Sequence, residues 1–179
     1  GGAGSDGEPA LVVACGLPGV GKSTVASWIA DRLDAAYFRT DEIRKELFPE
    51  PDYTTAETET VYETLVERGR AAVARGENAV LDGTFKRRRH RLEPVEVARE
   101  LAVTFRLVKV EAAESEVRDR IRDRTDDVSD ADVSVHEQFR EEFEPVGIDH
   151  EVLDNSEHFA VTERELERRF PQDAVLVPQ

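Results

Sequence analysis

The chain alternates between two hydrophobic periodicities along most of its length. Short apolar runs, typical of buried strands, are separated by longer stretches in which apolar residues recur every three or four positions, as on one face of a helix. The predicted strands cover residues 11–15, 36–39, 78–82, 103–110 and 151–154. One predicted helix begins near residue 22, and the others cover 41–47, 55–75, 86–100, 115–124, 132–143 and 162–170. This alternation of strand and helix predicts an α/β fold built on a parallel sheet.

Particular residues set several of these boundaries. Thr54 or Thr55 can cap the long third helix, and Gly76 ends it. Pro94 predicts that the next helix bends or begins afresh, because proline cannot donate the helical hydrogen bond. A length of 179 residues, without an internal repeat or a linker, suits one domain over 11–171. A flexible arm over 1–10 and a tail over 172–179 are expected to flank it.

The glycine-rich run between the first strand and the first helix has the Walker A spacing: Gly, four residues, then Gly-Lys-Ser. Backbone amides of such a loop surround phosphate oxygens, and the helix N-terminus adds its positive dipole end. Lys22 is expected to reach the β- and γ-phosphates of a nucleoside triphosphate, and Ser23 to ligate Mg²⁺. The predicted phosphate-binding residues are Gly16, Leu17, Pro18, Gly19, Val20, Gly21, Lys22, Ser23 and Thr24.

Charge and cysteine content add context to this prediction. The net charge is −15, from 39 acidic and 24 basic residues, and 20 of the basic residues are arginine. Abundant carboxylates with scarce lysine resemble proteins of salt-loving archaea and bacteria, in which acidity says little about binding partners. The single cysteine, Cys15, excludes an internal disulfide framework and fits a reducing cytoplasm. No apolar stretch approaches the ~20 residues of a membrane span.

Asp41 and Arg44 follow the second predicted strand, at the edge of the sheet where ligands bind in open α/β folds. Asp41 is a candidate general base that accepts the proton of an attacking hydroxyl. Arg44 lies one helical turn later and is a candidate to grip an anionic group of the acceptor. The alternative is that Asp41 merely caps the short helix, which leaves Arg44 unexplained.

The third predicted strand ends in Asp82-Gly83-Thr84, the Walker B layout in which the aspartate holds Mg²⁺ or its waters. Thr84 is a candidate hydrogen-bond partner of the acceptor. A dense basic stretch, 86–91, follows, and part of it is expected to bind an anion or the acceptor, with Arg88 as the candidate. The alternative is a solvated helical turn, although positive charge at a helix start opposes the dipole. His90 is expected to be a surface side chain.

Four arginines alternate with other residues over 118–124. Arg120 and Arg124 are four apart, on one helical face, just before a polar segment with the character of a lid. They are candidates to close over the γ-phosphate and to stabilise charge on the transferring group. Arg118 and Arg122 are expected to pair with acidic residues at the surface.

Together these motifs resemble the small P-loop kinases of the polynucleotide-kinase and zeta-toxin-like group (AAA_33-type), over roughly 11–155. The resemblance implies a P-loop NTPase fold in which helices sandwich a five-stranded parallel sheet, similar to nucleoside-monophosphate kinases with a short lid. It implies that Asp41 is the general base and that Arg44 holds the acceptor's phosphate. It further implies that Arg120 and Arg124 form the lid pair.

The expected activity is transfer of the γ-phosphate of MgATP to the 5′-hydroxyl of a polynucleotide or nucleotide. ATP and Mg²⁺ are the expected cofactors, and no membrane partner is expected. The acidic segment 125–130 departs from the polynucleotide kinases, and gluconate and adenylylsulfate kinases share the scaffold, so the acceptor stays open. The alternatives are a kinase of a small metabolite such as a sugar acid, and a nucleotide-binding switch or toxin-like module with slow hydrolysis.

Overall fold

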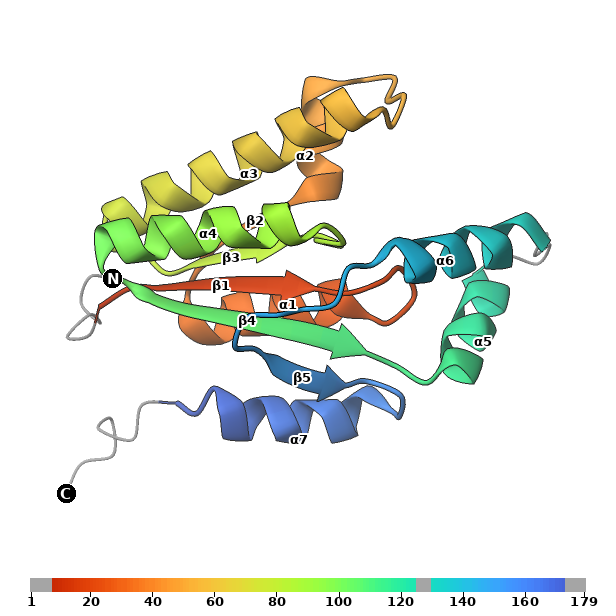
Figure 1. The fold of residues 1–179 in the computed structure, drawn as a ribbon. Coiled ribbons are helices and arrows are strands. Elements are labelled where there is room, and N and C mark those ends of the chain that lie inside the picture. The colour runs from red at the N-terminus through yellow and green to blue at the C-terminus, as the bar shows by residue number, and fades with distance from the viewer. Residues whose placement is uncertain (1–7, 125–129, 173–179) are drawn as a thin grey trace.

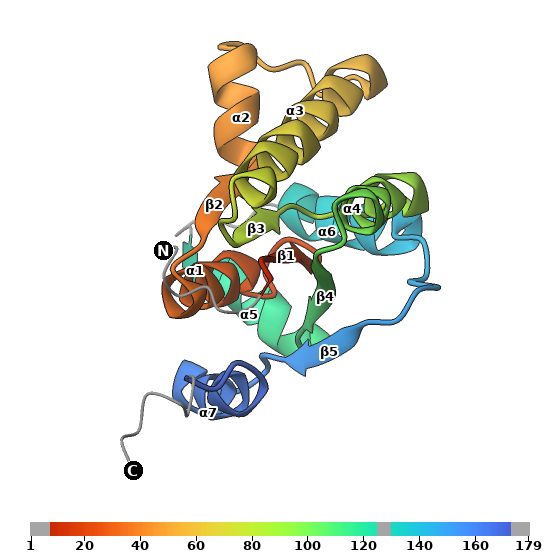
Figure 2. The ribbon, with the colours of Figure 1, turned by 90° about the vertical axis from the view of Figure 1, so that its left-hand side faces the viewer.

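The computed structural model describes residues 8–124 and 130–172, which form a five-stranded parallel sheet covered by helices on both faces (Figures 1 and 2). The strands are β1 (Ala10–Cys15), β2 (Ala36–Arg39), β3 (Ala79–Asp82), β4 (Thr104–Glu111) and β5 (Glu151–Asp154). Their order across the sheet is β2-β3-β1-β4-β5, and every neighbouring pair is parallel. The predicted parallel sheet is confirmed.

The helices divide between the two faces of the sheet. On one face lie α3 (Thr55–Ala74) and α4 (Arg88–Leu101), and on the other α1 (Lys22–Leu33) and α7 (Phe159–Arg169) (Figure 2). The short α2 (Thr40–Leu47) links β2 to α3. The pair α5 (Glu114–Arg124) and α6 (Asp130–Glu142) forms an arm beyond the end of β4 (Figure 1). Of the helices in the described ranges, none has the length and apolar character needed to cross a bilayer.

Strand β1 lies at the centre of the sheet, between β3 and β4. Leu11 and Val13 belong to the core under α3 and α4, whereas Val12 and Ala14 belong to the core under α1 and α7. Side chains alternate along a strand, so a strand buried on both faces needs consecutive apolar residues. The glycine-rich loop that follows β1 therefore leaves the sheet at its centre, where ligands bind in open α/β folds.

Most predicted boundaries agree with the structure to within two residues, and β2 and β5 match. Helix α4 continues through Pro94, whose side chain is buried, so the predicted fresh start at this residue is wrong, while the predicted bend stays a prediction. Helix α7 begins at Phe159, earlier than the predicted residue 162. These differences lie at helix ends and at one proline, where tertiary packing overrides local preference.

The inner end of the predicted N-terminal arm is part of the folded domain. The Thr104 backbone amide donates to the carbonyl of Pro9 at 3.1 Å, and the Ala10 amide donates to the side chain of Asn78 at 2.8 Å. The sheet therefore begins slightly before the predicted boundary. Residues 1–7 of the arm, residues 125–129 of the predicted lid segment 125–130, and residues 173–179 of the tail lie outside the described residues.

Arg91 anchors the start of α4 to the chain that follows α6. Its side chain is 1% exposed, and burial lowers the pKa of the guanidinium. The guanidinium donates to four backbone carbonyls, those of Phe85 (2.7 Å), Lys86 (3.1 Å), Glu144 (2.5 Å) and Pro145 (3.1 Å). A buried charge requires such partners. The alternative that 86–91 is a solvated helical turn is therefore wrong at Arg91.

Replacing Arg91 by methionine keeps an unbranched stem that reaches about as far as Nε but removes every one of these donors. We expect Arg91→Met to lower the free energy of unfolding by about 3 kcal/mol or more, because four buried acceptors lose a charged partner. Arg99→Met is the matched control in the same helix, since the Arg99 side chain is 71% exposed. Urea denaturation should show a change within about 0.5 kcal/mol for that control. Equal stability of the two variants would contradict the anchoring role.

Candidate active site

The glycine-rich loop is shaped by two left-handed backbone positions. Gly19 has φ 91° and Gly21 has φ 82°, a region that side chains rarely adopt. A Cβ at Gly21 would collide with the side-chain amide of Asn155, and one at Gly19 would lie 2.8 Å from Val117. Gly21 then directly precedes the first turn of α1. The loop thus has the backbone course that a phosphate-binding loop requires.

Asn155 holds this loop from the end of β5. Its amide nitrogen donates to the Val20 carbonyl at 2.9 Å, and its amide oxygen accepts from the Thr162 hydroxyl at 2.6 Å. Its own backbone carbonyl accepts from the Arg120 guanidinium at 2.6 Å. Sequence reasoning missed this residue. The available signal was a polar side chain directly after a strand, the same signal that identified Asp82.

Asp82 is the polar centre of the site. Its carboxylate is 2% exposed, and it accepts hydrogen bonds from the Ser23 hydroxyl (3.0 Å) and the Tyr37 hydroxyl (2.5 Å). The Lys22 ammonium forms an ion pair with the same carboxylate, and the Arg39 Nε lies 3.8 Å from it. The structure therefore brings together the Walker A and Walker B side chains that the sequence predicted. Tyr37 and Arg39 were not predicted.

The partners of Asp82 show how its charge is balanced. Burial raises the pKa of Tyr37, and the hydrogen bond to Asp82 raises it further, so the phenol stays protonated and donates to the carboxylate. Lys22 is 14% exposed, and its ammonium balances the Asp82 charge as an ion-pair partner. A hydroxyl and a carboxylate side by side are oxygen donors of the kind that Mg²⁺ prefers. Among the described residues, no group of three or more His, Cys, Asp or Glu side chains has a metal-binding arrangement.

Asp41 lies in the first turn of α2 and is exposed. It borders a cavity of about 280 Å³ whose other walls come mainly from the glycine-rich loop: Leu17, Pro18, Gly19, Gly21, Lys22, Ser23, Thr24, Thr40 and Thr84. The N-cap of α2 is Arg39, and no side chain caps the helix. The helix-cap alternative for Asp41 is therefore wrong.

A second cavity of about 340 Å³ adjoins the first and shares Asp41 with it. Pro18, Thr40 and Thr84 also border both cavities. The remaining walls come from α2, α3, the start of α4 and α6: Arg44, Tyr53, Thr55, Thr58, Glu59, Tyr62, Lys86, Arg87, Arg89, His90 and Phe139. Asp41 and Thr84 thus lie where the two cavities meet.

Arg44 reaches the second cavity from α2 and is fixed there by α3. Its guanidinium donates to Glu57 at 2.8 Å and to the Thr58 hydroxyl at 3.2 Å. Glu57 is buried, which by itself would raise its pKa, but hydrogen bonds from the Asp52 amide and from Arg44 leave the pKa lowered. The ionised carboxylate therefore holds Arg44 at the cavity wall.

The basic stretch 86–91 separates into different environments. Lys86 pairs with Glu142, and Arg89 pairs with Glu59, while both side chains still line the second cavity. Arg87 lines this cavity as well, but Arg88 is not among its lining residues, and its backbone amide donates to Glu144 at 2.6 Å. The acceptor-binding role of Arg88 stays a prediction, and the geometry favours its two neighbours.

His90 is a correction to the sequence prediction. The ring is 2% exposed, stacks on Tyr62 with centroids 4.1 Å apart, and contacts Glu59 at 3.0 Å. Burial lowers the pKa of His90, although the nearby Glu59 carboxylate opposes this effect. The helical position alone gave no sign that the first turn of α4 packs against α3.

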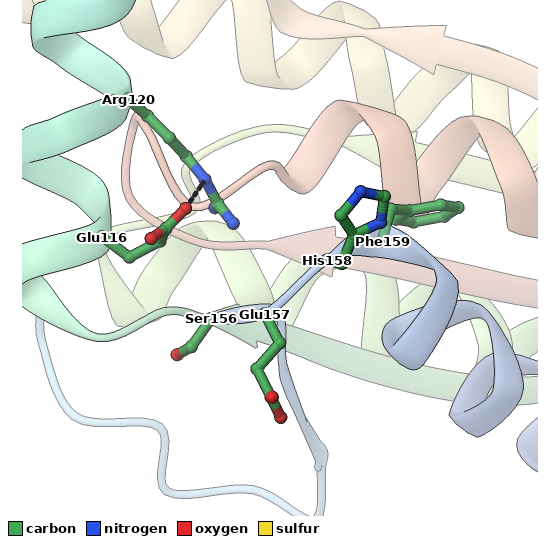
Figure 3. Close-up of a pocket in the computed structure, with 6 residues that line it drawn as sticks. All are labelled: Glu116, Arg120, Ser156, Glu157, His158 and Phe159. Atoms are coloured by element: carbon green, nitrogen blue, oxygen red, sulfur yellow. Dashed lines mark ion pairs between the residues drawn. The ribbon is translucent and has the colours of Figure 1, made fainter.

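Arg120 contacts the glycine-rich loop from helix α5. It donates to the Gly19 carbonyl at 3.3 Å and pairs with Glu116 at 3.2 Å. Figure 3 shows it beside a further cavity, of about 490 Å³, lined by Glu116, Arg120, Ser156, Glu157, His158 and Phe159. Arg120 does not line either of the two cavities that Asp41 borders.

Two other arginines of α5 match their prediction. Arg118 pairs with Glu114 and Glu137, and Arg122 lies 3.8 Å from Asp119, which confirms surface pairing for both. Arg124 ends α5, but its side chain lies outside the described residues. Its place in a lid pair with Arg120 therefore stays a prediction.

Residues 11–146 match the AAA_33 family, which is described as an AAA domain. The chain belongs to this family. The AAA_33 match includes the glycine-rich loop, Asp41 and Asp82, but it ends before β5, so Asn155 lies beyond it. The AAA_33-type resemblance expected from the sequence is confirmed.

Solved structures share the fold of this AAA_33 chain. A gluconokinase from Sinorhizobium meliloti 1021 is 22% identical, with a TM-score of 0.67 over 95% of this chain and 98% of its own. A sugar kinase from Janibacter sp. is 15% identical, with a TM-score of 0.67 over 96% and 99%. The Mycobacterium tuberculosis APS kinase in complex with AMPPNP and APS is 15% identical, with a TM-score of 0.64 over 90% and 96%. These likenesses confirm the P-loop NTPase fold.

The curated relatives are much longer than this AAA_33 chain. An uncharacterised protein of Mycobacterium tuberculosis H37Rv is 31% identical over 87 residues, which are 42% of this chain and 18% of that protein. A Mycobacterium bovis protein matches to the same extent. The chain therefore spans less than a fifth of the curated relatives it matches.

Asn155 and Asn78 provide a matched pair of tests at opposite ends of the sheet. The Asn78 side chain likewise makes two hydrogen bonds, both with backbone groups, those of Leu33 and Ala10, far from the glycine-rich loop. We expect each asparagine-to-alanine variant to lose about 1–3 kcal/mol of unfolding free energy. Asn155→Ala should also weaken binding of a non-hydrolysable ATP analogue by roughly tenfold, equivalent to about 1.4 kcal/mol. Calorimetric titration that gives the same affinity for both variants would contradict the support of the loop by Asn155.

Proposed function

We propose that the protein is an ATP-dependent kinase that transfers the γ-phosphate of MgATP to the 5′-hydroxyl of a polynucleotide or nucleotide. The observation that carries this proposal is the position of Asp41, which borders both the cavity at the glycine-rich loop and the second cavity. A general base must lie where donor phosphate and acceptor hydroxyl meet. The fold shared with solved kinases supports the same reaction class.

The residues present fit MgATP. The loop amides and Lys22 would hold the β- and γ-phosphates, while Ser23 and Asp82 would hold Mg²⁺ or its waters. Bound Mg²⁺ would supply charge neutralisation at the phosphates. The cavity beside Arg120, with the rings of His158 and Phe159 on its wall (Figure 3), supports a place for the adenosine moiety.

The proposed chemistry is a single in-line displacement. The acceptor hydroxyl oxygen forms a bond to the γ-phosphorus, and the bond from that phosphorus to the β–γ bridging oxygen breaks, which leaves ADP. The hydroxyl proton moves to the Asp41 carboxylate. Lys22 and Arg120, with Arg124, neutralise charge on the transferring group, and the contact between Arg120 and the Gly19 carbonyl supports a position near the loop.

The cationic side chains that line the second cavity support an anionic acceptor. Four cationic side chains line it, Arg44, Lys86, Arg87 and Arg89, against two carboxylates, Asp41 and Glu59. Glu57 and Glu142, which do not line the cavity, pair with Arg44 and Lys86, so the surroundings are close to neutral in a chain with a net charge of −15. A phosphate group gripped by Arg44 accounts for the cationic lining, since guanidinium and phosphate form charge-assisted bonds.

A sugar-acid kinase is the second candidate. The second cavity, of about 340 Å³, suits a small metabolite, and hydroxyl side chains on its wall can bind sugar hydroxyls. The shared fold with a gluconokinase and a sugar kinase agrees with this candidate. For either acceptor, the single buried Cys15 supports a reducing, cytoplasmic setting, and the composition supports a salt-rich one.

A label-transfer screen separates these candidates. With radiolabelled ATP at molar salt, we expect oligonucleotides and 3′-phosphorylated nucleosides with a free 5′-hydroxyl to be labelled in preference to gluconate. Lys22→Ala is the background control, because it removes the cation that faces the phosphates. Labelled gluconate with unlabelled oligonucleotide would overturn the polynucleotide assignment. ATP turnover unaffected by any acceptor would instead indicate a slow nucleotide-binding switch.

Asp41→Asn tests the general base directly. We expect it to lower kcat by about 10²–10⁴-fold, because a positioned base contributes that much. The affinity for MgATP should be nearly unchanged. Glu42→Gln is the matched control, since Glu42 is the exposed neighbour in the same turn and is not among the lining residues of either cavity. Equal effects of the two substitutions on kcat would exclude Asp41 as the base.

A further inference from the structure

Tyr53 stands out on the wall of the second cavity. Its side chain is 70% exposed, although large aromatic side chains normally bury much of their surface. It lies in the loop between α2 and α3, where its backbone has φ 57°. A bulky residue in this left-handed region is strained and persists because its surroundings hold it there.

Glu57 supplies that support. Its carboxylate accepts from the Asp52 amide at 2.8 Å, and a backbone hydrogen bond from Tyr53 also contributes to its lowered pKa. Glu57 is itself fixed in the first turn of α3, where its amide donates to the Thr54 hydroxyl at 3.1 Å. The aromatic ring is thus exposed but its backbone is firmly placed.

Arg44 covers part of the same ring. Its guanidinium carbon lies 4.7 Å from the ring centroid of Tyr53, and Glu57 holds both residues. A ring with a cation near one face and high exposure can accept a second planar group. The cationic group that would grip an acceptor phosphate and the exposed ring are therefore neighbours.

We infer that Tyr53 is the stacking platform for the base of a nucleotide acceptor, and hence a determinant of acceptor specificity. This inference rests on the proposed function, since it names a part of the acceptor that the same cavity would bind. Arg44 holds the phosphate, Tyr53 holds the base, and the 5′-hydroxyl is directed toward Asp41. Stacking is tolerant of base identity, because every base has a π-face.

The test uses two acceptors that differ only in the base: adenosine 3′-phosphate and the corresponding abasic ribose 3-phosphate analogue. Tyr53→Asn removes the ring without adding strain, because asparagine tolerates the left-handed region. We expect it to raise KM for adenosine 3′-phosphate roughly 5- to 100-fold, the loss seen when a base-stacking aromatic is removed. KM for the abasic acceptor, KM for ATP and kcat should stay within about twofold of the wild-type values, a change too small to reflect a lost contact.

Tyr53→Phe is the matched control, because it keeps the ring, and its KM values should remain those of the wild-type protein. A rise of KM for both acceptors together would overturn the stacking role and indicate that Tyr53 only supports Arg44. A wild-type protein that does not discriminate between the two acceptors would overturn it as well. Failure of the wild-type protein to label either acceptor, with gluconate labelled instead, would remove the proposed acceptor and the stacking role together.

Discussion

The burial of one carboxylate, Asp82, imposes the main constraint on this site. A buried charge is tolerated only when donors surround it, and the donors here come from the start of α1 and from β2. The same interaction therefore joins three neighbouring segments at the carboxyl edge of the sheet. The Lys22 ammonium that would meet a phosphate and the Ser23 hydroxyl that would meet a cation are both positioned by this carboxylate.

Two other buried charged groups organise the surroundings of this centre. Arg91 ties the chain after α6 to the beginning of α4, and Glu57 ties α2 and the following loop to α3. Each bonds to backbone groups outside the helices, the carbonyls of 85–86 and 144–145 for Arg91 and the Asp52 amide for Glu57, and so supplies partners to those groups. In addition to apolar packing, the helices and loops that follow the strands are therefore fixed by charged side chains. These side chains bond to backbone groups or to charged side chains of other segments.

The sequence alone was sufficient for the features that local pattern determines. The buried strand, the glycine loop, Asp41 and Asp82 follow from short-range spacing and from the rule that ligands meet the ends of parallel strands. The role of Asn155 could not be predicted in this way, because its side chain donates a hydrogen bond to the carbonyl of Val20, 135 residues earlier in the chain. His90 was misjudged and the burial of Arg91 was missed for a related reason: charge and helical position describe a residue's own turn, whereas burial depends on α3 and on the segment after α6.

The glycine-rich loop and the wall of the second cavity are held in place by different residues. The glycine-rich loop is held by Asn155 and Asp82, whereas the wall of the second cavity on α2 and α3 is held by Glu57. Substitutions in the loop between α2 and α3 can therefore reshape one wall while the phosphate-binding half keeps its geometry. Such a division makes the scaffold evolvable: duplicated copies can diverge toward new acceptors without rebuilding the machinery common to them all. A gluconokinase, a sugar kinase and an APS kinase are among the solved structures that share this fold, which by itself does not choose a substrate.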